Sequence, residues 1–178
     1  FHGDLSSGHD YASNPWTWPF MGRPTSFYYE GYDDGANGCP VDTCSAAVTD
    51  LANPVIWWAG TLAILALVLI WLGRRDWRAG AILGVYAAGQ LVWFLWPERT
   101  MFFFYTIAYT PFLILAITLC LGYLMRFGGP ANRRRNTVLV LAFVAVAVAV
   151  SAFFMPVWTG EMIPYEQWRA RMWMSSWI

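Results

Sequence analysis

Four long apolar stretches, joined by short polar connections, constrain this 178-residue chain more than any other feature. They cover residues 54–73, 79–96, 101–125 and 137–158. Each holds about 18–25 residues, enough to cross a hydrocarbon core of about 30 Å at about 1.5 Å per helical residue. A water-soluble domain has no use for four such segments. We therefore predict an all-α integral membrane protein with four transmembrane helices.

The composition agrees with this class and argues against another. Hydrophobic residues make up 58% of the chain and charged residues only 12%, whereas about a quarter of the residues of a soluble protein are charged. The formal net charge is zero, so the chain has no global basic field of the kind that attracts nucleic acid. We expect membrane lipid around this protein and no nucleic-acid partner.

The arginines alternate between the connections and predict an orientation. Seven of them lie in the connections after the first and third stretches: Arg74, Arg75, Arg78, Arg126, Arg133, Arg134 and Arg135. The positive-inside rule places these two connections in the cytoplasm. Residues 1–53, the turn at 97–100 and the tail at 159–178 then lie outside the cell. We expect a multi-pass protein of the bacterial plasma membrane with both ends of this chain extracytoplasmic.

The third stretch is the most polar of the four, with tyrosines and threonines between residues 105 and 118. Pro111 lies inside it. Because proline removes an intrahelical hydrogen bond, we expect a kink or a local unwinding there.

The segment at 1–53 carries the densest chemistry outside the apolar stretches. Its tryptophans and prolines suit a membrane interface, and residues 22–30 predict a short extended run. Cys39 and Cys44 are separated by four residues, and an oxidising compartment favours a disulfide between them, with free thiols or a metal site as alternatives. His2 and His9 are the only histidines and lack metal-ligand spacing. We expect no metal site.

Several unusual strings of residues are distributed along nearly the whole chain. They are residues 1–2, 9–19, 23–24, 27–29, 54–58, 74–80, 99–105, 160–161 and 168–178. Together they resemble the C-terminal part of the protein O-mannosyltransferase family, in its bacterial, actinobacterial-like branch. Asp10 departs from the pattern, because the family often has proline after this histidine.

The resemblance implies a membrane glycosyltransferase of the GT-C superfamily. It would transfer mannose from a polyprenyl-phosphate-mannose donor to serine or threonine hydroxyls of exported, unfolded or translocating proteins. The family's catalytic acid is an Asp-Glu pair in the first extracytoplasmic loop, and this chain contains no Asp-Glu dipeptide. We therefore expect a four-span C-terminal fragment without catalytic residues or a bound cofactor, which works with a missing N-terminal transmembrane half.

Arg99 is the strongest candidate for holding the donor phosphate. It is the only arginine between the second and third stretches, and guanidinium groups pair bidentately with phosphate oxygens. The alternative is an interfacial arginine that pairs with Glu98. Three aromatic residues that follow it are candidates for contacting the lipid chain of the donor: Phe102, Phe103 and Tyr105.

Four further outer residues are possible site-lining residues: His9, Arg23, Tyr28 and Tyr29. Arg23 could instead pair with an acid, and His9 could cap a turn. A transporter segment and a non-catalytic assembly module are the alternative functions. Transporters place ionisable groups or broken helices near the bilayer midplane, and here only Pro111 suggests a broken helix.

Overall fold

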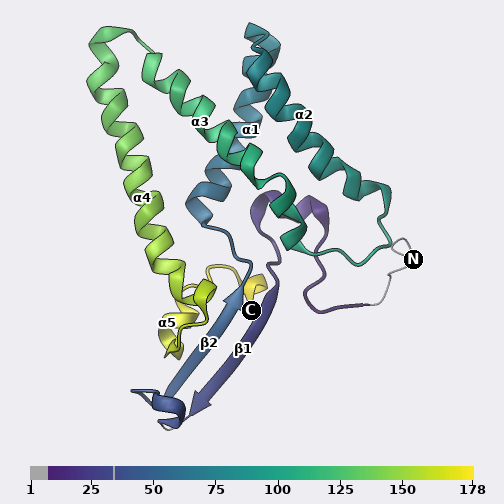
Figure 1. Cartoon of the computed structure of the whole chain (residues 1–178), viewed down its shortest axis with the longest axis vertical. Coiled ribbons are helices and arrows are strands. Elements are labelled where there is room, and N and C mark those ends of the chain that lie inside the picture. Colours follow the sequence, from purple (N-terminus) through teal and green to yellow (C-terminus); the bar gives the residue numbers. More distant parts are fainter. Residues whose placement is uncertain (1–7, 34) are drawn as a thin grey trace.

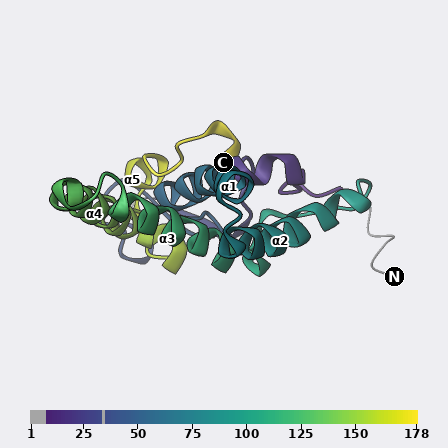
Figure 2. The same ribbon diagram turned by 90° about the horizontal axis from the view of Figure 1, so that it is seen from above.

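The structure is a computed structural model that describes residues 8–33 and 35–178. Phe1 and His2, which contribute to the family resemblance, lie outside the described residues. Four long helices fan out from a small sheet at one end of the molecule (Figure 1). Seen from above, they form a flat, elongated layer, with α4 at one edge and α2 towards the other (Figure 2).

The helices lie close to where the hydropathy predicts them. Their bounds are α1 Pro54–Arg74, α2 Trp77–Leu91, α3 Thr110–Arg126, α4 Arg133–Thr159 and the short α5 Tyr165–Arg169. A 3₁₀ turn at Val92–Leu95 extends α2. Among the described residues, three helical segments are long and apolar enough to cross a membrane, at 54–74, 77–95 and 130–159, whereas α3 is shorter at 17 residues.

Side chains encoded next to the apolar stretches start the first two helices. The Asn53 carboxamide accepts a hydrogen bond from the Ile56 N–H at 3.1 Å, and Pro54 occupies the first turn of α1. Arg75 ends α1 in the left-handed conformation with φ of 53°. The Asp76 carboxylate then caps α2 by accepting the Arg78 N–H at 3.0 Å. A two-residue connection thus reverses the chain between α1 and α2.

The third apolar stretch differs from the prediction. Residues 101–125 do not form one helix, because a 3₁₀ helix at Phe103–Ala108 precedes α3. Pro111 lies in the first turn of α3, where a missing N–H breaks no intrahelical bond. The expected kink within a continuous helix is therefore wrong, whereas the alternative, a local unwinding, agrees with the 3₁₀ helix that precedes Pro111 at the start of α3.

A three-stranded antiparallel sheet is the part that the all-helical prediction omitted. β1 Ser26–Asp33 overlaps the predicted extended run and pairs with β2 Thr43–Thr49. β2 pairs in turn with β3 Ile163–Pro164, so the sheet ties the C-terminal tail to the segment before α1. Cys39, in the connection between β1 and β2, forms a disulfide with Cys44 near the start of β2.

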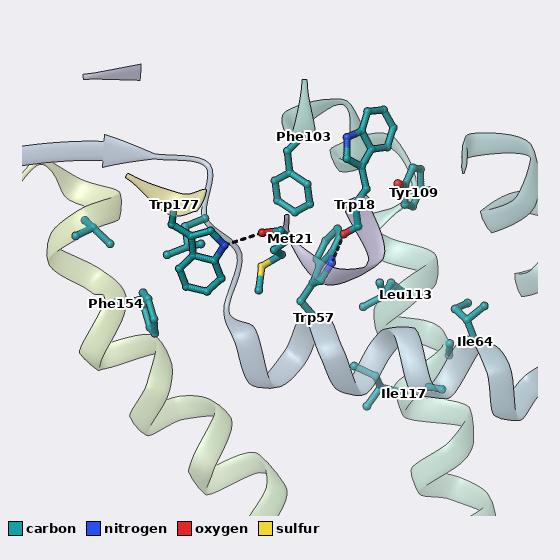
Figure 3. Close-up of a cluster of buried hydrophobic side chains, with 14 of the residues drawn as sticks. Trp18, Met21, Trp57, Ile64, Phe103, Tyr109, Leu113, Ile117, Phe154 and Trp177 are labelled. Atoms are coloured by element: carbon teal, nitrogen blue, oxygen red, sulfur yellow. Dashed lines mark hydrogen bonds between the residues drawn. The ribbon is translucent and has the colours of Figure 1, made fainter. Parts of the chain in front are cut away.

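A cluster of buried aromatic residues fixes the segment before α1 onto the helices (Figure 3). Trp18 is 0% exposed, and its carbonyl oxygen accepts a hydrogen bond from the Trp57 indole at 2.8 Å. The Trp177 indole donates to the Met21 carbonyl at 2.6 Å. Residues from three distant parts of the sequence therefore share one core at the sheet end of the helices.

Candidate functional site

Arg99 lies in the connection between α2 and α3, where two aromatic rings face its guanidinium group. The guanidinium carbon is 5.7 Å from the ring centres of both Trp93 and Tyr105. These two rings stack on each other at 4.6 Å with 20° between their planes. Ring faces attract a cation most strongly where water is excluded. The stacked pair therefore holds the Arg99 charge at one place on the molecule.

The polar atoms of Arg99 are incompletely used. Its Nε is buried and has no hydrogen-bond partner among the described residues. Among the described residues the ion pair joins Arg78 and Asp76, so the alternative pairing of Arg99 with Glu98 does not form there. A buried donor without an acceptor costs about 1–3 kcal/mol, which favours the approach of an acceptor from outside this chain.

The segment before β1 packs directly on the residues that follow Arg99. The Ser13 N–H donates to the Met101 carbonyl at 2.8 Å. The His9 ring meets the Phe102 ring edge-on at 5.0 Å, while His9 Nδ1 accepts the Tyr11 N–H at 3.1 Å. His9 thus caps a turn, as one reading of the sequence held, and also lies beside a predicted lipid contact.

The three predicted lipid contacts have different surroundings. Phe102 is half-buried and stacks on Phe104 at 5.4 Å, and Tyr105 packs edge-on against both rings. Phe103 is only 2% exposed and packs on Trp57 at 5.0 Å. Phe103 is therefore a core residue and cannot offer a surface to a lipid chain, which corrects the prediction. Phe104 is half-buried and lies on the partly exposed side instead.

Arg23 donates its hydrogen bonds to backbone carbonyl oxygens of this chain. Its Nε and Nη2 donate to the Asp10 carbonyl at 3.2 and 3.1 Å, and its Nη1 donates to the Ser176 and Ile178 carbonyls at 2.8 Å each. Its guanidinium also lies 5.1 Å from the Tyr11 ring centre. Arg23 therefore clamps the tail to the N-terminal segment and pairs with no acid among the described residues.

Tyr28 and Tyr29 lie on opposite faces of β1. The Tyr28 hydroxyl donates to Glu30 Oε2 at 2.5 Å, and Tyr32 donates to the same oxygen at 2.9 Å. These bonds lower the pKa of the exposed Glu30 carboxyl. The Tyr29 hydroxyl is 3.1 Å from Ser45 Oγ, and its ring lies 5.1 Å from Trp168.

The Tyr29 face of β1 borders a small aromatic pocket of about 260 Å³. Tyr11 and Trp177 line it together with residues of the tail. β1 reaches the Arg99 segment through Phe27, whose ring centre is 5.7 Å from that of Phe104. The structure thus links β1 to the Arg99 segment through Phe27, whereas Tyr28 and Tyr29 have partners of their own within the sheet and the tail.

Asp50 was not among the site residues predicted from the sequence. Its carboxylate accepts a hydrogen bond from the Thr25 N–H, and its second oxygen is buried without a partner. Burial raises the pKa of Asp50 to about 7, although the bonds from Thr25 oppose this shift. Asp50 lines a pocket of about 380 Å³ with Phe104 and Thr106. The sequence feature that could have pointed to Asp50 is a single acidic residue between an extended run and an apolar stretch.

Within residues 8–33 and 35–178, no group of three histidine, cysteine, aspartate or glutamate side chains gathers in a way that could hold a metal ion. The chemistry that this part of the chain can offer is therefore a positioned arginine, aromatic surfaces and a buried acid.

Comparison with known proteins identifies the family of this chain. Residues 1–177 match the family described as the C-terminal four-transmembrane region of protein-O-mannosyltransferase. The chain is 33% identical to the polyprenol-phosphate-mannose–protein mannosyltransferase of Mycobacterium tuberculosis and 34% identical to that of Mycolicibacterium smegmatis. Each match covers 99% of this chain and 35% of the relative. The chain thus spans about a third of the length of these relatives.

The fold has a counterpart among solved structures. The structure of the Saccharomyces cerevisiae protein O-mannosyltransferase Pmt1-Pmt2 complex bound to the sugar donor matches with a TM-score of 0.75 at 23% identity. That match covers 99% of this chain and 25% of the yeast chain. The small sheet and the four helices are therefore a shared arrangement. The chain belongs to the protein O-mannosyltransferase family, as its C-terminal four-transmembrane region.

Proposed function

We propose that this chain is the C-terminal membrane module of an enzyme that transfers mannose from polyprenyl-phosphate-mannose to serine or threonine hydroxyls of exported proteins. The family match over residues 1–177 and the names of the mycobacterial relatives support this activity. The module works with an N-terminal transmembrane half, which supplies the catalytic acid. The same family match and relatives disfavour the alternative function of a transporter segment.

The position of Arg99 at one end of the helices carries the proposal. The α1–α2 and α3–α4 connections both lie at the opposite end from the sheet (Figure 1). These two connections and the helix ends beside them hold seven of the 11 arginines, so the positive-inside rule assigns that end to the cytoplasm. Arg99 lies in the α2–α3 connection, on the extracytoplasmic side. We place the chain in the bacterial plasma membrane with this orientation.

The proposed reaction needs a cation where Arg99 is held. Transfer breaks the bond between the anomeric carbon of mannose and the phosphate oxygen, and forms a bond from that carbon to the acceptor hydroxyl oxygen. Negative charge then collects on the departing polyprenyl phosphate, and the hydroxyl proton passes to a base outside this chain. A guanidinium group already fixed by Trp93 and Tyr105 stabilises that charge without reorganising.

The aromatic residues beside Arg99 suit the lipid part of the same donor. Phe102 and Phe104 stack on each other and remain partly exposed next to Tyr105. Flat apolar rings next to a phosphate-binding cation would contact the first isoprene units of the polyprenyl chain. His9 packs on Phe102 from the N-terminal segment and completes this surface.

The test is mannose transfer by the full-length protein in membranes, from radiolabelled polyprenyl-phosphate-mannose to an acceptor peptide. Arg99→Ala should lower transfer by about 10²–10³, the usual cost of losing one donor to a developing oxyanion. Arg99→Lys should recover part of the rate, because it restores the charge but not the fork of donors. Arg169→Ala is the matched control on the exposed tail. Near-normal donor affinity and turnover in Arg99→Ala would refute the role.

A further inference from the structure

Two apolar grooves flank α3, one along most of its length and one beside its last turn, and they meet at the end of the helices opposite Arg99. The first is about 520 Å³ and runs between α2 and α3 over Ile82, Phe112 and Leu119. The second is about 550 Å³ and is lined by Ile70 of α1 with Leu124 and Phe127. Two residues line both grooves, Tyr123 and Arg126. Arg126 thus stands on a ridge between two apolar channels.

The nearby acid is already fully engaged. The Asp76 carboxylate accepts from Arg78 Nε at 3.0 Å and Nη2 at 2.7 Å, and from the Tyr123 hydroxyl at 2.6 Å. These bonds hold the pKa of Asp76 well below its usual range. Asp76 is also the only acidic residue between positions 51 and 97, and none occurs from 99 to 160. No carboxylate in these parts of the sequence is left for the other arginines.

Two arginines near the grooves therefore keep an uncompensated charge. The Arg74 guanidinium lies 5.2 Å from the Tyr123 ring centre, and the Tyr123 hydroxyl is anchored on Asp76. Arg126 ends α3, and neither arginine forms an ion pair with any described residue. Arg74 lines the second groove, so both cations border it. An apolar partner there would have to bury these charges without a counter-charge, which is costly.

We propose that this end of the module binds an anionic glycerophospholipid from the cytoplasmic leaflet. Its phosphate lies between Arg74 and Arg126, and its two acyl chains lie in the two grooves on either side of α3. The phosphate of this lipid neutralises the charge of the two arginines. Its acyl chains cover the apolar walls of the grooves. Basic residues near the cytoplasmic surface bind anionic lipid by the same electrostatic attraction.

Lipid retention by the full-length protein tests this proposal. The protein is purified from nanodiscs of phosphatidylglycerol or of phosphatidylcholine, and the retained lipid is counted by native mass spectrometry. We expect one phosphatidylglycerol to be retained per chain and phosphatidylcholine to be lost. Arg126→Gln should reduce phosphatidylglycerol retention about fivefold. Arg134→Gln removes the same charge from the same end but lines neither groove, so it should retain the lipid.

A second pair of variants tests the groove without changing any charge. A Cβ atom added at Gly122 would meet no atom within 4 Å, and Gly122 lines the groove between α2 and α3. Gly122→Leu should fold normally and displace one acyl chain. Gly84 is equally open but lines a different groove, between α1 and α2, so Gly84→Leu is the control.

Three results would overturn the proposal. Equal loss of lipid in Arg126→Gln and Arg134→Gln would show a general surface attraction instead of a site. Equal retention of both lipids by the wild-type protein would show that charge does not select the occupant. Absence of any retained lipid would indicate that helices of the N-terminal half cover the grooves.

Discussion

The two ends of this module use arginine differently, and the difference follows from what each guanidinium group meets. At the sheet end, Arg23 donates four hydrogen bonds to backbone carbonyls, whereas Arg99 is held by two aromatic rings with its Nε unpartnered. At the other end, Arg78 pairs with Asp76 and Arg126 stands between two grooves. Arg23 and Arg99 are the same residue type and lie at the same end of the helices. Their local partners separate a structural clamp from a candidate ligand-binding cation.

The largest effect should come from the core that supports the sheet end. Trp18 is fully buried, so Trp18→Ala should lower the free energy of unfolding of the full-length protein by about 3–5 kcal/mol. Trp16 is 72% exposed two residues away, and Trp16→Ala is the matched control. Thermal unfolding checks both. Equal stability of the two variants would mean that the segment before β1 is not anchored as the structure shows.

The next effect separates the two outer arginines directly. Arg23→Ala removes four hydrogen bonds from a charged donor and should lower the free energy of unfolding by about 1–3 kcal/mol. Arg99→Ala should leave the melting temperature nearly unchanged and abolish most mannose transfer. Thermal unfolding and transfer are measured on the same preparations. The comparison fails if Arg23→Ala loses transfer with no loss of stability.

A smaller effect should appear in the pH dependence of stability. The pKa of Asp50 is about 7 in the folded protein and about 3.9 in an unfolded chain. The folded state keeps a proton that the unfolded state releases, so this group makes the free energy of unfolding fall as pH rises from about 4 to about 7. Asp50→Asn keeps an acceptor for the Thr25 N–H but cannot ionise.

Melting temperatures of the full-length protein between pH 4 and pH 8 provide the measurement. The Asp50→Asn variant should gain stability relative to the wild type as pH rises, and the gain should level off above pH 7. Asp42→Asn changes an exposed carboxyl and serves as the control. A constant difference between wild type and Asp50→Asn across this range would contradict the buried, protonated state of Asp50.

Much of the helical framework could be predicted from the sequence because it depends on local properties. Apolar stretches of sufficient length predict the helices, and Asn53 and Asp76 lie where their side chains cap α1 and α2. The third stretch was predicted as one span because hydropathy does not distinguish a 3₁₀ helix from an α-helix. Pro111 is compatible with either a kink or a helix start, and only the path of the chain before it decides.

The site was less predictable because it depends on partners far away in the sequence. Two of the carbonyl oxygens that accept hydrogen bonds from Arg23 belong to Ser176 and Ile178, which lie 153 and 155 positions later in the sequence. Nothing near Arg23 in the sequence therefore reveals its role. Phe102 and Phe103 are adjacent and chemically identical, yet only Phe103 faces Trp57 in the core. Arg99 could be proposed from its side of the membrane, but the ring pair that holds it includes Trp93 from the preceding helical turn.

Binding of the donor by the full-length protein tests the central claim most directly. The dissociation constant for polyprenyl-phosphate-mannose is measured in nanodiscs for the wild type, Arg99→Ala and Arg169→Ala. We predict at least about tenfold weaker binding for Arg99→Ala, since one charge-assisted pair contributes about 1.5–3 kcal/mol, and no change for Arg169→Ala. Equal dissociation constants for the wild type and Arg99→Ala would contradict the assignment of Arg99 to the donor phosphate.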